Sequence, residues 1–427
     1  MTGKKHEKHH GHGHEPFFGG KILTGILIVA FIALFVFVFI VPNISSEIAN
    51  EKIEIAVLLP LSGPDAEYGN ICKAGINLAL NEALEKGKNV NLVYYDTGTD
   101  PSMALDEYFH AVENGAQVIL GPFKTVETEY IAPYAEIYKT VLITPVTGTS
   151  ISDYNKYVFR FVPSNYNFCN AVLTLAKNYA VTNMTVLWVE NTLGKSTYDL
   201  FSEVASEEGI QITGIPLSSY DDVIAELNTS SDQLIYVIPE TADQLSGLLT
   251  TIADRNLSLL SKIFIASDDA FGSSLRDNVD ALATNVLVPS LSTADPFFLQ
   301  KFKNEYGSDF DVMYGYALYG YDALTTLIDV MSGSEKTGPE IAEKLKNYRY
   351  LGQTGPIVFD ENLDRFPTYD TYDSEWGKWG SYSLFTLLYT QIGENVDDYT
   401  DIKMRILDAY HSGNESLARQ IYETEWK

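Results

Sequence analysis

The sequence predicts an α/β fold with two parallel-sheet lobes, preceded by one N-terminal transmembrane helix. Three observations support this prediction. From Lys52 onward, apolar runs of strand length alternate with stretches of helical periodicity, which is typical of parallel sheets covered on both faces. The chain has 427 residues, too many for one small core and enough for two lobes of ordinary size. Residues 22–41 form an uncharged, mostly apolar stretch.

The N-terminal region is expected to anchor the chain in the cell membrane. Residues 1–21 form a basic, His-rich tail, for which we expect disorder, with loose binding of a divalent metal as the alternative. Residues 22–41 would cross a hydrocarbon core of roughly 30 Å at about 1.5 Å per residue. Lysines precede this span and glutamates follow it, so the tail is expected in the cytoplasm and the globular part outside the cell, as in a single-pass protein. The short linker 42–51 would keep the globular part near the membrane.

Composition excludes several classes of function. The formal net charge is −28, and such an acidic surface repels phosphate backbones, so no nucleic acid is expected as a partner. The two cysteines, Cys72 and Cys169, are too few for a disulfide scaffold and have no metal-type spacing. We expect them to be buried free thiols.

The first strand and the loop after it organise the chain. Ile55–Leu59 is an unbroken apolar run, which suits a strand buried on both faces. It ends in the turn-forming residues Pro60–Pro64, and helical periodicity follows from Ile71. The loop between them lies at the carboxyl end of the strand, where open α/β sheets bind their ligands. The other elements of this series are expected as strands Asn91–Tyr95, Ala116–Leu120, Val141–Thr144 and Tyr157–Phe161, and helices Pro101–Asn114 and Thr128–Tyr138.

A second series of strands and helices follows with the same alternation. We expect strands Thr185–Val189, Gln233–Ile238, Lys262–Ala266 and Val286–Pro289, with helices Phe168–Tyr179, Thr197–Glu208 and Ala242–Arg255. Three further helices and one extended segment are expected at Pro296–Tyr306, Tyr316–Met331, Ile341–Lys346 and Gly355–Asp360. Residues 396–427 are expected to form a C-terminal helical extension that packs against a lobe.

Catalytic patterns are missing from the sequence. Outside the tail the histidines are His110 and His411, far apart in the sequence and without metal-type spacing, and no Gly-x-Ser-x-Gly elbow occurs. Residues 193–197 imitate the end of a phosphate-binding loop, but Val189 stands where that loop requires its first glycine. We therefore expect no enzyme activity, no metal site and no cofactor.

Several short motifs in the same order identify a family resemblance. They are Pro60–Pro64 with Tyr68–Gly69, Val118–Pro122, Ile143–Pro145, Phe159–Arg160, Tyr321–Ala323, and Thr354–Gly355 with Phe359–Asp360. Over roughly Lys52–Trp379, the chain resembles the branched-chain amino-acid (leucine, isoleucine, valine) binding proteins, a type I periplasmic solute-binding family.

The resemblance implies two Rossmann-like lobes joined by three hinge crossings, near Ser164, Ser290 and Leu351. Lobe 1 would comprise residues 52–164 and 290–350, and lobe 2 residues 165–289 and 351–395. In this family a small-molecule ligand binds between the two lobes, which then close. Its partners would be the permease and ATPase subunits of an ABC importer.

Candidate residues for a ligand carboxylate lie in the first lobe. Backbone N–H groups after Gly121, and in the loop Val146–Thr149, can donate hydrogen bonds to an anion. The resemblance places Thr125, Val146, Thr147 and Gly148 at the carboxylate. Gly148 lacks the hydroxyl that is usual there, so Thr147 or Thr149 would have to supply it. Lys124 stands where the family has a cysteine, and its charge would lie near the carboxylate.

The resemblance implies an ammonium acceptor at Asp268, beside Asp269; alternatively, either residue caps the following helix. Tyr68 is expected either at the edge of the cleft or packed under the first helix. Leu193 stands at one position where the family usually has an aromatic residue, and Glu240 or Thr241 stands at another. This leaves a more polar or cationic ligand, or an amide, open.

The sequence thus predicts a membrane-anchored extracellular solute-binding protein of an ABC-type importer, binding an amino acid or related small polar metabolite. The alternative is the ligand-binding ectodomain of a sensor coupled to a separate signalling chain, because the 21-residue tail is too short to be a kinase.

Overall fold

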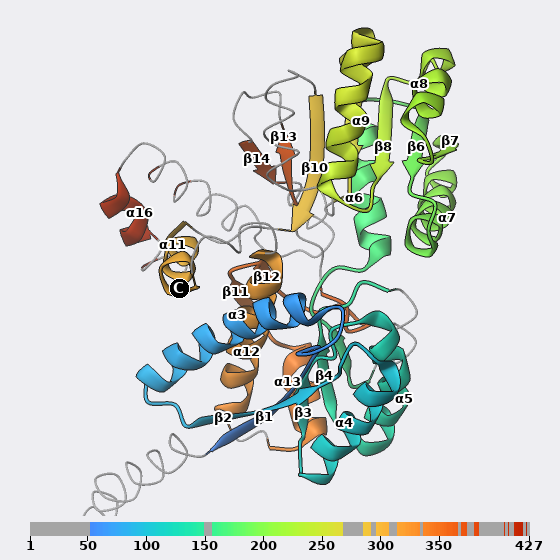
Figure 1. Ribbon diagram of the computed structural model, residues 1–427. Coiled ribbons are helices and arrows are strands. Elements are labelled where there is room, and N and C mark those ends of the chain that lie inside the picture. The colour runs from blue at the N-terminus through green and yellow to red at the C-terminus, as the bar shows by residue number, and fades with distance from the viewer. Residues whose placement is uncertain are drawn as a thin grey trace, which may run out of the picture. The chain divides into compact units, whose positions relative to one another are not determined.

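The computed structural model describes residues 52–148, 156–267, 285–291, 296–306, 314–333, 336–365, 369–373, 380–383 and 414–421, with single residues at 405, 409 and 424 (Figure 1). The predicted tail, membrane span and linker, and most of the C-terminal extension, lie outside these residues. Within the described part of the chain, no helix is both long and apolar enough to span a bilayer. The one helix described in the extension is α16 (Glu415–Ile421).

The first sheet is parallel throughout. Its strands stand in the order β2-β1-β3-β4-β5. They are β1 (Ile53–Leu59), β2 (Val90–Asp96), β3 (Val118–Leu120), β4 (Val141–Thr144) and β5 (Val158–Arg160). Because all strands run the same way, the loops after β1, β3 and β4 meet at one edge of the sheet.

Residues of β1 alternate between two covered faces. Ile55 and Val57 share a core with α3 (Ala66–Glu85) and α12 (Tyr314–Met331). Ala56 and Leu58 face the other way, toward α4 (Pro101–Glu113) and α5 (Thr125–Tyr138). Successive side chains of a strand point to opposite faces, so a strand covered on both sides needs an unbroken apolar run. The expectation for this strand is confirmed.

Two glycines let α3 and α12 approach each other backbone to backbone. A Cβ atom on Gly75 would lie 1.8 Å from the carbonyl oxygen of Ala317, and one on Gly320 would lie 2.5 Å from that of Cys72. Helices α11 (Pro296–Tyr306) and α13 (Gly338–Lys346) contribute apolar side chains to the same core. The first lobe is therefore built from two distant parts of the chain.

The second sheet has the order β14-β13-β10-β9-β8-β6-β7. It consists of β6 (Asn183–Trp188), β7 (Gln211–Pro216), β8 (Leu234–Ile238), β9 (Ile263–Ala266), β10 (Asn285–Leu291), β13 (Tyr369–Asp373) and β14 (Gly380–Ser383). Strands β6 to β10 are parallel, whereas β13 and β14 join as an antiparallel edge.

Among the described residues, four helices cover the second sheet in pairs. Helices α6 (Asn165–Asn178) and α7 (Thr192–Glu207) share one core with the sheet, and α8 (Tyr220–Thr229) and α9 (Ala242–Arg255) share the other. The predicted α/β fold with two parallel-sheet lobes is confirmed. The sequence does not predict strands β7, β11 (Tyr350–Gly352), β13 and β14, helix α8 or the short 3-10 helix Leu257–Ser261.

The chain stays with the first lobe beyond Leu351, near which the sequence places its third crossing. Strands β11 (Tyr350–Gly352) and β12 (Gly355–Ile357) form a hairpin, and Phe359 and Leu363 pack in the first core. The physical reason is Asp322 on α12, whose buried carboxylate needs donors. It accepts hydrogen bonds from the backbone N–H groups of Gln353 and Thr354, at 2.8 and 2.7 Å.

One smaller expectation can be compared with the structure. Cys72 and Cys169 are both buried and free, as predicted. Separately, Leu363 has φ +60° and so adopts the left-handed conformation that a glycine would favour.

Candidate ligand-binding site

Hydrogen bonds fix the loop between β3 and α5. The Thr144 hydroxyl donates to the carbonyl oxygen of Pro122 at 2.7 Å, and the Thr128 hydroxyl donates to that of Lys124 at 2.9 Å. The two hydroxyl oxygens lie 3.3 Å apart. The end of β4 and the first turn of α5 therefore hold this loop between them.

Thr125 is the first residue of α5, three residues before the start that the sequence predicts. Its N-cap residue, Lys124, makes no side-chain hydrogen bond to the first turn. The first N–H groups of a helix have no partner within the helix and attract anions. Thr125 therefore presents a hydroxyl beside donors that the N-cap side chain does not occupy.

Gly148 lies directly against Thr125. A Cβ atom on Gly148 would lie 2.3 Å from the Cγ2 atom of Thr125 and 3.0 Å from its hydroxyl oxygen. The fold therefore brings together two segments that the resemblance assigns to one carboxylate. The methyl group of Thr125 fills the space that a larger residue at position 148 would need.

The loop after β4 divides its residues between core and surface. The Val146 side chain is buried in the first lobe, so its main chain is the part left for a ligand. Thr147 is exposed, and its carbonyl oxygen accepts a hydrogen bond from the Asn165 N–H at 2.9 Å. The Gly148 carbonyl oxygen accepts one from Nη1 of Arg160 at 2.5 Å. Thr149 lies outside the described residues.

Tyr68 belongs to an aromatic cluster in the first lobe. Its ring meets Tyr316 of α12 edge-on, with centroids 5.3 Å apart. Phe123 of the β3–α5 loop lies 5.1 Å from the same Tyr316 ring. Phe123 and Tyr316 are not among the site residues predicted from the sequence. Phe123 could have been found because it lies two residues before Thr125 in the sequence. Tyr316 lies far along the chain, and nothing in the sequence indicates its place beside the loop.

Two carboxylates organise the loops around this cluster. Asp65 forms an ion pair with Lys124 at 2.7 Å, which joins the β1–α3 loop to the β3–α5 loop. Burial alone would raise the pKa of Asp96, but hydrogen bonds from Ser62, Gly98 and Leu61 outweigh it and lower that pKa. Asp96 therefore stays ionised and holds the β1–α3 loop.

Glu127, in the first turn of α5, is a titratable group that the sequence does not single out. It is 1% exposed, and neither carboxyl oxygen has a hydrogen-bond partner among the residues that the structure describes. Burial raises its pKa, and the nearby Thr97 hydroxyl and Lys124 offset this only in part. Glu127 thus accepts a proton more readily than an ordinary glutamate.

The predicted second-lobe residues follow neighbouring strands. Leu193 is in the first turn of α7, after β6, and the Leu193 side chain is not described. In the same turn the Asn191 side chain accepts a hydrogen bond from the Gly194 N–H at 2.8 Å. Glu240 follows β8, is exposed, and donates its N–H to Oε1 of Gln244 at 2.8 Å. Since β6 and β8 pair in parallel, both residues lie at one edge of the second sheet. Asp268 and Asp269 lie outside the described residues.

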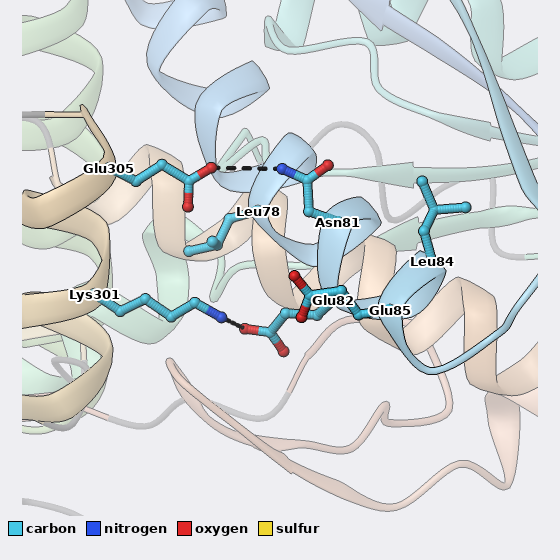
Figure 2. A pocket seen from close by; sticks show the side chains of 7 residues that line it. All are labelled: Leu78, Asn81, Glu82, Leu84, Glu85, Lys301 and Glu305. Atoms are coloured by element: carbon cyan, nitrogen blue, oxygen red, sulfur yellow. Dashed lines mark hydrogen bonds and ion pairs between the residues drawn. The ribbon is translucent and has the colours of Figure 1, made fainter.

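A separate surface pocket of about 310 Å³ lies between α3 and α11 and contains none of the predicted site residues (Figure 2). Lys301 pairs with Glu82 at 2.6 Å, and Asn81 donates to Glu305 at 3.4 Å. These contacts already occupy much of its polar lining, so it gives no reason to place a ligand there. In the described ranges, no three His, Cys, Asp or Glu side chains gather as metal ligands would.

Comparisons with known proteins agree with this architecture. Residues 52–378 match the family model described as periplasmic binding protein. The leucine-, isoleucine-, valine-, threonine- and alanine-binding protein of Pseudomonas aeruginosa is 25% identical over 343 residues, which cover 75% of this chain and 89% of that protein. An uncharacterized protein of Methanocaldococcus jannaschii is 28% identical over 239 residues, 51% of this chain, and the match spans 57% of its length.

Solved structures with little sequence identity share the fold. The leucine-binding protein LivK of Thermotoga maritima has a TM-score of 0.59 at 22% identity, covering 77% of this chain and 97% of that one. A substrate-binding protein of Desulfitobacterium hafniense in complex with Leu has a TM-score of 0.62 at 21% identity, and the match covers 78% of this chain and 100% of that one. A solute-binding protein of R. palustris in complex with 4-hydroxybenzoate has a TM-score of 0.62 at 16% identity, and the match covers 78% of this chain and 96% of that one.

Proposed function

Since the chain belongs to the periplasmic binding protein family, we propose that it is a solute-binding protein of an ABC-type importer. It captures an amino acid or a related small polar metabolite between two closing lobes and delivers it to permease and ATPase subunits. The observation that carries this proposal is the contact of Thr125 with Gly148 at the start of α5.

The ligand class follows from what the first lobe offers. The Thr125 hydroxyl, the first N–H groups of α5 and the main chain of the loop 146–148 are hydrogen-bond donors suited to a carboxylate. The named ligands of the similar structures, leucine and 4-hydroxybenzoate, both carry a carboxylate although the rest of each molecule differs. The first lobe therefore binds the carboxylate, and other residues determine which solute is chosen.

The second lobe completes the site when the lobes close. Asp268 accepts the ligand's ammonium group, and Glu240 and Leu193 border its side chain. A carboxylate that faces a cleft gains a partner when a cationic group arrives. Glu240 in place of an aromatic residue favours a ligand with polar or cationic character over leucine, isoleucine or valine.

The protein is tethered to the outer face of the cell membrane. Residues 22–41 form a single span, the tail 1–21 lies in the cytoplasm and the linker 42–51 carries the lobes outside. This tether keeps the binding protein beside its permease.

Calorimetry on the full chain in nanodiscs tests the proposed site. L-Amino acids, their amides and 4-hydroxybenzoate are screened first, and binding in the micromolar range, about −8 kcal/mol, is expected for at least one amino acid. Thr125→Val should weaken that binding about tenfold or more, because a hydrogen bond to a charged group contributes about 1.5–3 kcal/mol. Asp268→Asn should weaken binding of the amino acid but leave binding of 4-hydroxybenzoate, if it binds, unchanged.

A matched control and two outcomes complete the experiment. Thr250→Val, on an exposed position of α9, should bind like the wild type. Normal binding by Thr125→Val would remove this hydroxyl from the site. For the importer, ligand-loaded protein should stimulate ATP hydrolysis by the reconstituted permease and ATPase, whereas the sensor alternative predicts no stimulation.

A further inference from the structure

Arg160 links the ligand loop to another part of the chain. It is the last residue of β5 and its side chain is fully buried. Nη1 donates to the carbonyl oxygen of Gly148 at 2.5 Å, and Nε donates to Oδ1 of Asp364 at 2.8 Å. One guanidinium therefore contacts both the loop assigned to the ligand carboxylate and the segment after β12.

Main-chain hydrogen bonds hold these two segments side by side. The Arg160 N–H donates to the carbonyl oxygen of Leu363 at 3.0 Å, and the Arg365 N–H donates to that of Arg160 at 3.0 Å. Nη1 of Arg365 donates to the Phe161 carbonyl oxygen at 3.3 Å. The segment that ends β5 and the segment 360–365 are thus joined by hydrogen bonds of both the backbone and the side chains.

Both segments lead from the first lobe to the second. After β5 the chain reaches Ser164, which caps the first helix of the second lobe. After Arg365 it reaches β13 of the second sheet. Rotation of one lobe against the other concentrates backbone change in such connecting segments.

The chemistry of arginine makes this link stiff. Its guanidinium is planar, keeps its charge and holds its donors in a fixed fork. A buried guanidinium must keep its partners, because an unpaired buried charge is strongly unfavourable. A displacement of the Gly148 carbonyl therefore acts on Asp364, and a displacement of Asp364 acts on the loop.

We propose that Arg160 is a positioning residue that couples the ligand loop 146–148 to the two connecting segments at 161–164 and 360–365. Filling the loop and moving the lobes then become a single event. This role in ligand response rests on the proposed function, whereas the coupling itself exists in the ligand-free protein and is testable there.

Hydrogen–deuterium exchange of the full chain without ligand tests the coupling. In Arg160→Lys, which keeps the charge but loses the fork, peptides covering 146–148, 161–164 and 360–365 should all exchange about tenfold faster. Asp364→Ala releases the same guanidinium at its other end and should give the same pattern, so it serves if Arg160→Lys does not fold. Asp364→Asn keeps an oxygen for Nε and should stay within about threefold of the wild type.

Arg365→Lys is the matched control. Its guanidinium donates hydrogen bonds to Thr354 and to the carbonyl oxygen of Phe161. It should accelerate exchange in the connecting segments and leave 146–148 unchanged. Unchanged exchange of 146–148 in Arg160→Lys and Asp364→Ala, or equal acceleration there in Arg365→Lys, would overturn the proposal.

A second measurement follows the response to a ligand, with L-lysine, a cationic amino acid, as the probe. Dyes are attached at Ile137→Cys and Leu257→Cys, exposed positions of the first and second lobe, while the native cysteines are buried. Energy transfer should change on saturation of the wild type, and in Arg160→Lys that change should fall by half or more; an undiminished change would contradict the coupled event. If L-lysine does not bind the wild type, the cationic form of the proposed function fails, and hydrogen exchange alone decides the coupling.

Discussion

Removal of the Asp322 carboxylate should destabilise the first lobe more than most single substitutions. The side chain is fully buried on α12. Its oxygens accept hydrogen bonds from the N–H groups of Gln353 and Thr354, at 2.8 and 2.7 Å, and from the Thr354 hydroxyl at 2.6 Å. Asp322→Ala leaves these buried donors without an acceptor.

The magnitude follows from the groups left unpaired. A buried donor that loses its partner costs about 1–3 kcal/mol, so the two N–H groups alone cost about 2–6 kcal/mol. For a unit of this size that loss lowers the Tm by about 10 °C. Asp322→Asn keeps one acceptor oxygen and presents an amide NH₂ to the remaining donor, so it should cost roughly half as much.

Thermal melts and urea titrations followed by circular dichroism measure both variants. Asp106→Ala, an exposed carboxylate on α4, is the control and should stay within about 0.5 kcal/mol of the wild type. A cost below about 1 kcal/mol for Asp322→Ala would show that water or other groups satisfy these donors, and would refute the reasoning.

Three further predictions concern other positions in the two lobes. Glu127→Gln should raise the Tm near pH 7 and change it little at about pH 4. Burial raises the pKa of Glu127, so the stability that its protonated form provides is lost as the pH rises through that value. A Tm difference that does not depend on pH would contradict this. Gly148→Ala should lower the free energy of unfolding by about 1–3 kcal/mol through the clash with Thr125, and urea titrations should show that added Thr125→Ala recovers at least half. Cys72 and Cys169 should not react with Ellman's reagent in the folded protein at neutral pH, since burial raises each thiol pKa to about 12. Both should react in denaturant. Reaction with the native protein would show that the thiols are accessible.

Central strands and their helices could be predicted because a buried strand leaves an unbroken apolar run and an amphipathic helix leaves a periodic apolar pattern. β1 and α9 are clear examples. The edge strand β7 gives no such signal, since most of its residues are exposed or half-buried. β13 is equally hidden, because its sequence, YDTYD, has no apolar run. The start of α5 was placed too late because Lys124 is not a usual N-cap residue.

The candidate site could be predicted only in part, for a related reason. Loops after neighbouring parallel strands meet at one edge of a sheet, so the closeness of Thr125 and Gly148 follows from strand order. The contact of Phe123 with Tyr316 depends on how a distant helix returns to the sheet. The role of Asp322 in holding a hairpin is equally tertiary, because Gln353 and Thr354 lie 31 and 32 residues further along the chain.

Because α3 packs against α12 through glycine contacts, the first core can be completed only late in the synthesis of the chain. Ribosomes complete α3 long before α12, yet the apolar face of β1 and α3 is covered only when α12 arrives. Until Met331 has been synthesised, this apolar surface has no α12 to pack against, and exposed apolar surface of this kind is prone to aggregation. Truncated forms that end before α12 should therefore accumulate as insoluble protein, even though they contain every strand of the first sheet.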